Sequence, residues 1–173
     1  MTACFPTHPD AHLYIGLMSG TSLDGVDGVL VQWNAAQQLQ VLGYASQAFP
    51  QELRQELLAL NSPDGRNELH RAALAGNAVS RAYAAVVQQL LQHTSTTASQ
   101  VQAIGAHGQT VRHQPQLHDG TGYTLQLQNP ALLAELTGIT VVADLRSRDL
   151  AAGGQGGPLV PAFHQGIFGR ADQ

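Results

Sequence analysis

Tyr14-Ile-Gly-Leu-Met-Ser-Gly-Thr-Ser-Leu-Asp-Gly-Val-Asp27 decides the fold of this chain, because it places a small, hydroxyl-rich and acidic turn between two apolar runs. Residues 12–18 have the composition of a buried strand, and residues 26–33 alternate as a second strand. The turn is therefore predicted to join a hairpin. Gly20 and Gly25 permit positive φ and close backbone approach, Thr21 and Ser22 offer hydroxyl donors, and Asp24 offers a carboxylate for a magnesium-bound water. This small, hydroxyl-rich and acidic turn suits polyphosphate and magnesium. A tight glycine-rich hairpin with a purely structural role is the alternative.

Composition excludes several classes of protein. The chain has 173 residues, 43% of them apolar, which is enough for the core of one domain or one lobe. A net charge of −4 and only 12% charged residues leave no basic stripe of the kind that binds nucleic acid. All eight basic residues are arginines, so a Walker lysine, a Schiff-base lysine and a serine-lysine dyad are excluded within these residues.

Cysteine and histidine usage excludes further kinds of site. Cys4 is the only cysteine, so neither a disulfide framework nor a thiolate zinc site can form within one chain. His113, His118 and His164 lack the spacing of a metal site. No leader-like segment or apolar run of membrane-spanning length is present, so we expect a cytoplasmic protein with no membrane partner.

The remaining pattern predicts an α/β fold. Residues 39–49 are a third predicted strand, and three consecutive strands indicate an antiparallel meander. Pro50 is expected at the first position of a short helix, and apolar spacing predicts a long helix over residues 67–92. The other expected elements are a strand at 101–106, a polar glycine loop at 105–110, a strand at 123–127, a helix at 130–137 ended by Gly138, and a strand at 139–143. We therefore predict a mixed sheet, with the meander followed by helices and further strands, as in one ribonuclease H-like lobe of the actin, hexokinase and sugar kinase ATPase superfamily.

A second dense polar segment covers residues 143–164 and contains arginines, aspartates and several glycines. Arg146 and Arg148 can grip a carboxylate or phosphate bidentately, and Asp144 can accept hydroxyl hydrogens or bind magnesium through water. In the alternative interpretation, Arg148 and Asp149 merely pair and the glycines form a mobile surface loop.

Three ordered motifs carry a family resemblance. Residues 16–27, the Gly-Ala-His-Gly-Gln-Thr string at 105–110 and the arginine- and glycine-rich string at 142–156 closely resemble anhydro-N-acetylmuramic acid kinase. The resemblance implies a cytoplasmic enzyme of cell-wall recycling that uses ATP and Mg²⁺. Such an enzyme opens the 1,6-anhydro ring of its small-molecule sugar by hydrolysis and phosphorylates O6, and the full-length family is expected to be homodimeric.

The resemblance also implies roles for individual residues. The ATP-phosphate hairpin would consist of Gly20, Thr21, Ser22, Leu23, Asp24, Gly25, Val26 and Asp27, with Asp24 holding Mg²⁺ through water. The sugar pocket would contain His107, Gln109, Thr110, Arg148, Asp149 and Gln155. Arg148 suits the lactyl carboxylate of the sugar. His107 is equally consistent with a buried histidine held by a backbone carbonyl.

The sequence departs from the family in ways that bear on activity. Gln128 stands where the family usually has glycine, which raises the question of whether that backbone position needs glycine freedom. No residue matches the motif of the catalytic base, which is expected downstream of this chain. We therefore expect a flexible segment at residues 1–11, an incomplete N-terminal lobe at 12–168, a truncated end at 169–173 and little unaided activity. A non-enzymatic remnant or interaction module, or another sugar kinase of the superfamily, are the alternatives.

Overall fold

The computed structural model describes residues 12–34 and 38–169. The chain divides into two compact units, which are described separately. The first comprises Met1–Arg112 and Leu125–Asp144, and the second His113–Thr124 and Leu145–Gln173. The predicted flexible segment at residues 1–11 and most of the predicted truncated end lie outside the described residues.

The first unit begins with the predicted antiparallel meander, which is confirmed. Strands β1 (His12–Ser19), β2 (Gly25–Trp33) and β3 (Leu39–Ala48) pair in the order β3-β2-β1, with Gly16 opposite Val29. Side chains along β1 and β2 alternate between buried and more exposed positions, which is the period of two that the sequence shows. One face of the meander is therefore committed to the core.

Strand β4 (Val101–Pro115) lies parallel to β1 and places Gln109 opposite Ser19. The predicted loop at residues 105–110 was wrong, because β4 continues straight through that segment. Its polar side chains are accommodated by hydrogen bonds within the protein instead of by solvent, and polarity alone therefore gave a misleading loop signal. Strand β5 (Gly122–Leu127) also neighbours β4, and the predicted strand at 139–143 is reduced to β6 (Val141–Val142), which pairs with β4.

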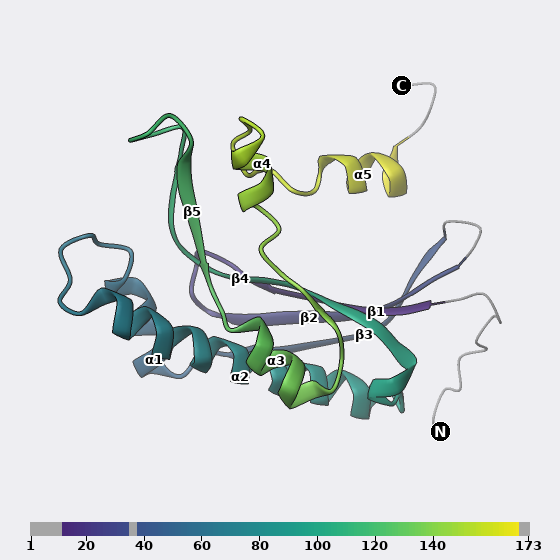
Figure 1. Cartoon of the computed structure of the whole chain (residues 1–173). Helices are drawn as coiled ribbons and strands as arrows, with labels where there is room; N and C mark the ends of the chain where they lie inside the picture. The colour runs from purple at the N-terminus through teal and green to yellow at the C-terminus, as the bar shows by residue number, and fades with distance from the viewer. Residues whose placement is uncertain (1–11, 35–37, 170–173) are drawn as a thin grey trace. The chain divides into compact units, whose positions relative to one another are not determined.

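Helices α1 (Gln51–Ala59), α2 (Glu68–Thr94) and α3 (Pro130–Thr137) gather on one face of the sheet (Figure 1). Pro50 precedes α1 as its N-cap instead of occupying the first helical position. Asn129 caps α3 by accepting the Leu132 N–H at 3.0 Å, and Gly138 ends that helix in the left-handed conformation, as predicted. A short 3₁₀ helix, η1 (Ala98–Gln100), precedes β4.

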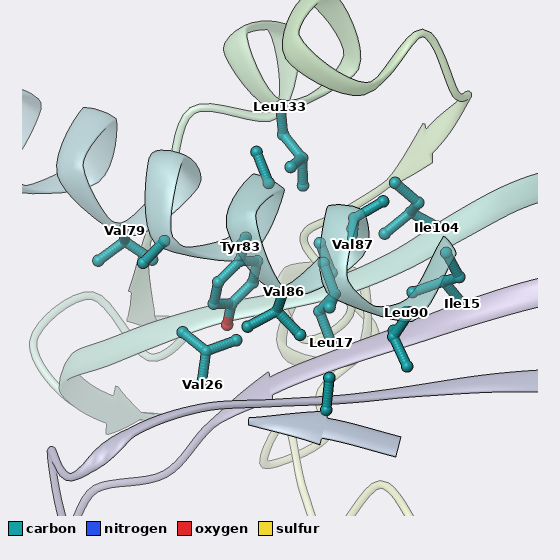
Figure 2. Close-up of a cluster of buried hydrophobic side chains, with 14 of the residues drawn as sticks. Ile15, Leu17, Val26, Val79, Tyr83, Val86, Val87, Leu90, Ile104 and Leu133 are labelled. Carbon is teal, nitrogen blue, oxygen red and sulfur yellow. The ribbon is translucent and has the colours of Figure 1, made fainter. Parts of the chain in front are cut away.

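The core of the first unit lies between α2 and the strands. Val86, Val87 and Leu90 of α2 are fully buried among side chains of β1 and β4, and Leu133 approaches from α3 (Figure 2). A Cβ atom added at Gly28 would lie 2.5 Å from a methyl carbon of Val86, so β2 needs a glycine where the helix crosses it. This close approach fixes the meander against α2.

The second unit contains the tip of the β4–β5 hairpin, α4 (Ser147–Ala151) and α5 (Pro161–Phe168). At the tip, the His118 ring stacks on Tyr123 with centroids 5.8 Å apart, and Asp119 accepts hydrogen bonds from the backbone N–H groups of Thr121 and Gly122. Of the helices that the structure describes, none has the length and apolar character needed to cross a membrane.

Candidate functional site: the β1–β2 turn and the glycine loop

The turn between β1 and β2 is closed by its own backbone. The Gly20 carbonyl accepts the Leu23 N–H at 3.2 Å, and the Asp24 carbonyl accepts the Phe49 N–H at 3.1 Å. Leu23 adopts φ 57° and is only 5% exposed, so its buried side chain anchors the turn to the core. Gly20 and Gly25, whose conformational freedom the sequence analysis noted, do not adopt positive φ, and Leu23 takes that conformation instead.

Gly25 is required by space and not by φ. A Cβ atom at this position would lie 2.2 Å from the Gln47 carbonyl oxygen and 2.8 Å from the Ala48 Cα atom. Both neighbours are backbone atoms of β3, so neither can swing away as a side chain could. The close approach of β3 thus fixes where the turn enters β2.

The polar side chains of the turn differ in their availability. Ser22 Oγ donates a hydrogen bond of 2.8 Å to Asp24 Oδ1, whereas the exposed Thr21 hydroxyl makes no hydrogen bond within the described residues. Asp27 is exposed and accepts a hydrogen bond of 2.5 Å from the Tyr44 hydroxyl of β3. Val26 is buried in the core, so any contribution of Val26 to ligand binding has to come from its backbone.

The Ser22 hydroxyl lowers the pKa of Asp24 from its ordinary value, with further lowering from backbone N–H groups and from the charge of Arg54. Hydrogen bonds to the ionised form favour that form. Asp24 is therefore a carboxylate at neutral pH, as a ligand for a magnesium-bound water must be.

Replacing Ser22 with alanine tests whether the Ser22 hydroxyl lowers the pKa of Asp24. We expect Ser22→Ala to raise the pKa of Asp24 toward the ordinary aspartate value, because the largest cause of its depression is removed. A depressed carboxylate pKa adds stability that is present above the unfolded-state pKa and is lost as pH falls through the folded-state pKa. In the variant this added stability is smaller, and as pH falls it is lost at a higher pH than in the wild type. NMR titration of the Asp24 carboxyl carbon measures the shift. Thr21→Ala is the control and should leave the Asp24 titration in place, whereas an unchanged Asp24 pKa in Ser22→Ala contradicts the assignment.

The predicted pocket residues of β4 lie inside the first unit. His107 is 5% exposed, and its Nδ1 atom is 2.8 Å from the Gly108 carbonyl oxygen, which is the contact described by the alternative interpretation of this histidine. Gln109 is fully buried and donates from Nε2 to the Gly20 carbonyl at 3.0 Å. Thr110 Oγ1 accepts a hydrogen bond of 3.1 Å from Gln126 Nε2. Of these residues, Gln109 is the one that the structure brings to the β1–β2 turn.

Gln128 is accommodated without glycine freedom. Its φ is not positive, and its Nε2 atom donates to the Ala106 carbonyl at 3.1 Å. The same carboxamide lies over Gly108, where an added Cβ atom would be 3.1 Å from Gln128 Nε2, and Gly108 has φ +77°. The conformational freedom of glycine is therefore used at Gly108 of β4 and not at position 128.

In the second unit, Asp149 organises the glycine-rich segment of residues 152–157 that follows α4, here called the glycine loop. Its Oδ2 atom accepts the Gly156 N–H at 2.7 Å, and Arg146 Nη1 donates to the Gly156 carbonyl. A Cβ atom at Gly154 would lie 2.2 Å from Asp149 Oδ2, so the loop folds directly over this carboxylate. Asp149 therefore shapes the loop through its carboxylate, a role that the sequence did not indicate.

Arg148 and Gln155 are both exposed in this unit. Arg71 pairs with Glu56 and Arg112 with Glu68, but Arg148 and Asp149, both among the described residues, do not form the ion pair considered in the alternative interpretation. The guanidinium of Arg148 is thus accessible to an anionic ligand, whereas that of Arg146 is held by the glycine loop.

Comparison with known proteins identifies the family. The sequence model of the anhydro-N-acetylmuramic acid kinase family matches residues 12–173. The chain belongs to this family. Its fold is accordingly the α/β lobe of the sugar-kinase type that the sequence predicts, with the antiparallel strands β3-β2-β1 followed by the parallel strand β4.

Curated members of the anhydro-N-acetylmuramic acid kinase family are highly similar. The chain is 68% identical over 161 residues to an anhydro-N-acetylmuramic acid kinase of Variovorax paradoxus, covering 93% of this chain and 42% of the relative. It is 70% identical over 161 residues to one of Albidiferax ferrireducens, covering 93% of this chain and 41% of the relative. It is 65% identical over 156 residues to one of Bordetella petrii, covering 90% and 40%. The chain thus spans about two fifths of the length of the curated relatives that it matches.

Sequence reasoning missed two buried polar residues beneath the turn of this kinase-family lobe. Tyr83 of α2 and Ser19 of β1 are fully buried or nearly so and hydrogen-bond each other, although 64 positions separate them in the chain. Tyr83 fits the apolar spacing of the helix, so the sequence indicated a core residue and gave no sign of the contact.

Proposed function

We propose that this chain contributes the ATP-phosphate hairpin and part of the sugar pocket of an enzyme that acts on 1,6-anhydro-N-acetylmuramic acid. The enzyme opens the anhydro ring with water and phosphorylates O6, giving N-acetylmuramic acid 6-phosphate for cell-wall recycling. The observation that carries the proposal is the β1–β2 turn, which is held in a defined shape and displays exposed polar groups, in a chain that matches this kinase family from residue 12 onward.

The exposed polar groups of the turn fit a nucleotide with its magnesium ion. The Thr21 hydroxyl is exposed and can donate to a phosphate oxygen, and the Asp24 carboxylate is exposed and can accept from a magnesium-bound water. Magnesium, when bound, offsets negative charge on the phosphates during transfer. The residues of this chain bind and orient the phosphates, and a catalytic base is not assigned among them.

The second unit fits the anionic part of the sugar. The exposed Arg148 guanidinium can form a bidentate pair with the lactyl carboxylate. Asp149 and Arg146 hold the glycine loop, which follows Arg148 in the sequence. Gln155, which is exposed in that loop, adds an amide for sugar hydroxyls. In this proposal the enzyme works in the cytoplasm as a homodimer with a small-molecule sugar as its substrate.

Nucleotide binding by this chain tests the proposal. We expect calorimetry to detect binding of ATP that requires Mg²⁺ and that Asp24→Asn weakens about tenfold, because a charge-assisted hydrogen bond is lost. Asp64→Asn, an exposed aspartate in the α1–α2 connection, is the matched control and should bind as the wild type does. A coupled assay with anhydro-N-acetylmuramic acid then measures turnover.

The outcomes separate the proposed function from its alternative. Mg²⁺-dependent ATP binding that is sensitive to Asp24 supports the kinase role even where the chain alone shows no turnover. A wild-type chain that binds neither ATP nor the sugar overturns the proposal and favours a non-enzymatic interaction module that retains the lobe.

A further inference from the structure

A buried polar cluster lies directly beneath the β1–β2 turn. Its side chains come from three elements, Ser19 at the end of β1, Tyr83 of α2 and Gln109 of β4, and they are 1%, 0% and 0% exposed. Apolar side chains, including those of Val26, Val79 and Val86, surround Tyr83 in Figure 2, where its hydroxyl oxygen points away from α2. Three polar groups are thus gathered in the core at the point where the chain leaves β1 for the turn.

The hydrogen-bond directions in this cluster follow from the available protons. Ser19 Oγ donates to the Gly108 carbonyl at 3.2 Å, and the Tyr83 hydroxyl oxygen lies 2.9 Å from Ser19 Oγ. Because Ser19 has a single hydroxyl proton and the carbonyl can only accept, Tyr83 donates to Ser19. Burial raises the pKa of Tyr83 to about 12, so this donor keeps its proton throughout the physiological range. The last residue of β1 is therefore held between α2 and β4.

Gln109 holds Gly20, the residue that follows Ser19. Its Nε2 atom donates to the Gly20 carbonyl at 3.0 Å, which is the same carbonyl that closes the turn by accepting the Leu23 N–H. Gln109 Oε1 is buried and has no hydrogen-bond partner in the part of the chain that the structure describes. A buried acceptor without a partner costs on the order of 1–3 kcal/mol. Stability alone therefore gives a poor account of a glutamine at this place.

We propose that Tyr83 and Gln109 are positioning residues that hold the turn of residues 20–24 in the shape that binds phosphate. Neither side chain is exposed, so each acts through a residue that it holds: Tyr83 through Ser19, and Gln109 through the Gly20 carbonyl. Both contacts fix the same end of the turn from neighbouring elements, which predicts that loss of either one loosens the turn locally. In this inference Gln109 acts through the turn, and not as the direct sugar contact that the resemblance implies. The part of this inference that concerns ATP rests on the proposed function.

The test compares Tyr83→Phe with Tyr14→Phe. Both changes remove a single hydroxyl, but the Tyr14 side chain is exposed on β1 and its hydroxyl makes no hydrogen bond within the described residues. We expect hydrogen exchange of the backbone amides of residues 20–24, measured without nucleotide, to accelerate at least fivefold in Tyr83→Phe and to stay at the wild-type rate in Tyr14→Phe. The affinity for Mg·ATP should fall about tenfold in Tyr83→Phe, whereas binding of adenosine, which has no phosphate, should be unchanged. Gln109→Met, which removes the Nε2 donor at similar length, should reproduce both effects and provides the test if Tyr83→Phe fails to fold.

The outcomes distinguish this inference from the proposed function. If the backbone amides of residues 20–24 exchange at the wild-type rate in folded variants, the inference is overturned, whatever the nucleotide affinity of the variants. Acceleration spread equally over α2 and the other strands also overturns it, because that result indicates a general loss of core stability. If exchange in the variants accelerates only in the turn but the wild-type chain binds no ATP, the positioning role is supported and the proposed function is overturned.

Discussion

Gly25→Ala is expected to lower the free energy of unfolding by about 3 kcal/mol and to weaken Mg·ATP binding at least tenfold. The added Cβ atom would lie 2.2 Å from the Gln47 carbonyl oxygen, so β3 has to move away from the start of β2. That movement also strains the hydrogen bond between the Phe49 N–H and the Asp24 carbonyl, which attaches the turn to the end of β3. Thermal unfolding followed by circular dichroism measures the stability, and calorimetry at a temperature where the variant is folded measures the affinity.

Gly16→Ala is the matched control for that substitution. It makes the same change on the adjacent strand β1, where the nearest side-chain atom would be a methyl carbon of Val29 at an ordinary 3.5 Å. We expect its stability to stay within about 0.5 kcal/mol of the wild type. Equal stability of Gly25→Ala and Gly16→Ala would show that β3 does not approach Gly25 as closely as the structure places it.

The parts of the fold that local pattern determines were predictable. Alternation of apolar and polar residues predicted the β1–β2 hairpin, and the apolar spacing predicted the long helix that is observed as α2. Gly138 and Asn129 ended and began α3 as their capping chemistry requires. These features depend on neighbouring residues, so a single sequence contains the necessary information.

The features that the sequence did not predict depend on distant contacts. The segment at residues 105–110 continues as β4 because β1 lies beside it, and its polarity is explained by partners such as Ser19 and Gly20. Likewise, the left-handed conformation falls on Leu23 because its side chain is drawn into the core. The roles expected for Arg148 and Gln155 stay predictions, since they depend on a ligand.

Leu90→Ala is expected to lower the free energy of unfolding by about 3–4 kcal/mol. The Leu90 side chain is fully buried, and its two methyl carbons would lie 3.2 Å and 3.8 Å from Cβ atoms built on Gly28 and Gly43, so it fills the space over both glycines. Alanine leaves a cavity there that two strands without side chains at these positions cannot close. For a chain of this size, such a loss corresponds to a fall in melting temperature of roughly 10 °C.

Leu69→Ala makes the same change in the same helix at a side chain that is 91% exposed. We expect this control to melt within about 1 °C of the wild type, because little apolar area is removed from contact with the protein. A small effect of Leu90→Ala would show that α2 can settle onto β2 and β3 without this side chain. If the large effect is found, the variant still has every residue of the β1–β2 turn, so its ATP affinity at low temperature shows whether the meander needs α2 firmly packed beneath it to bind nucleotide.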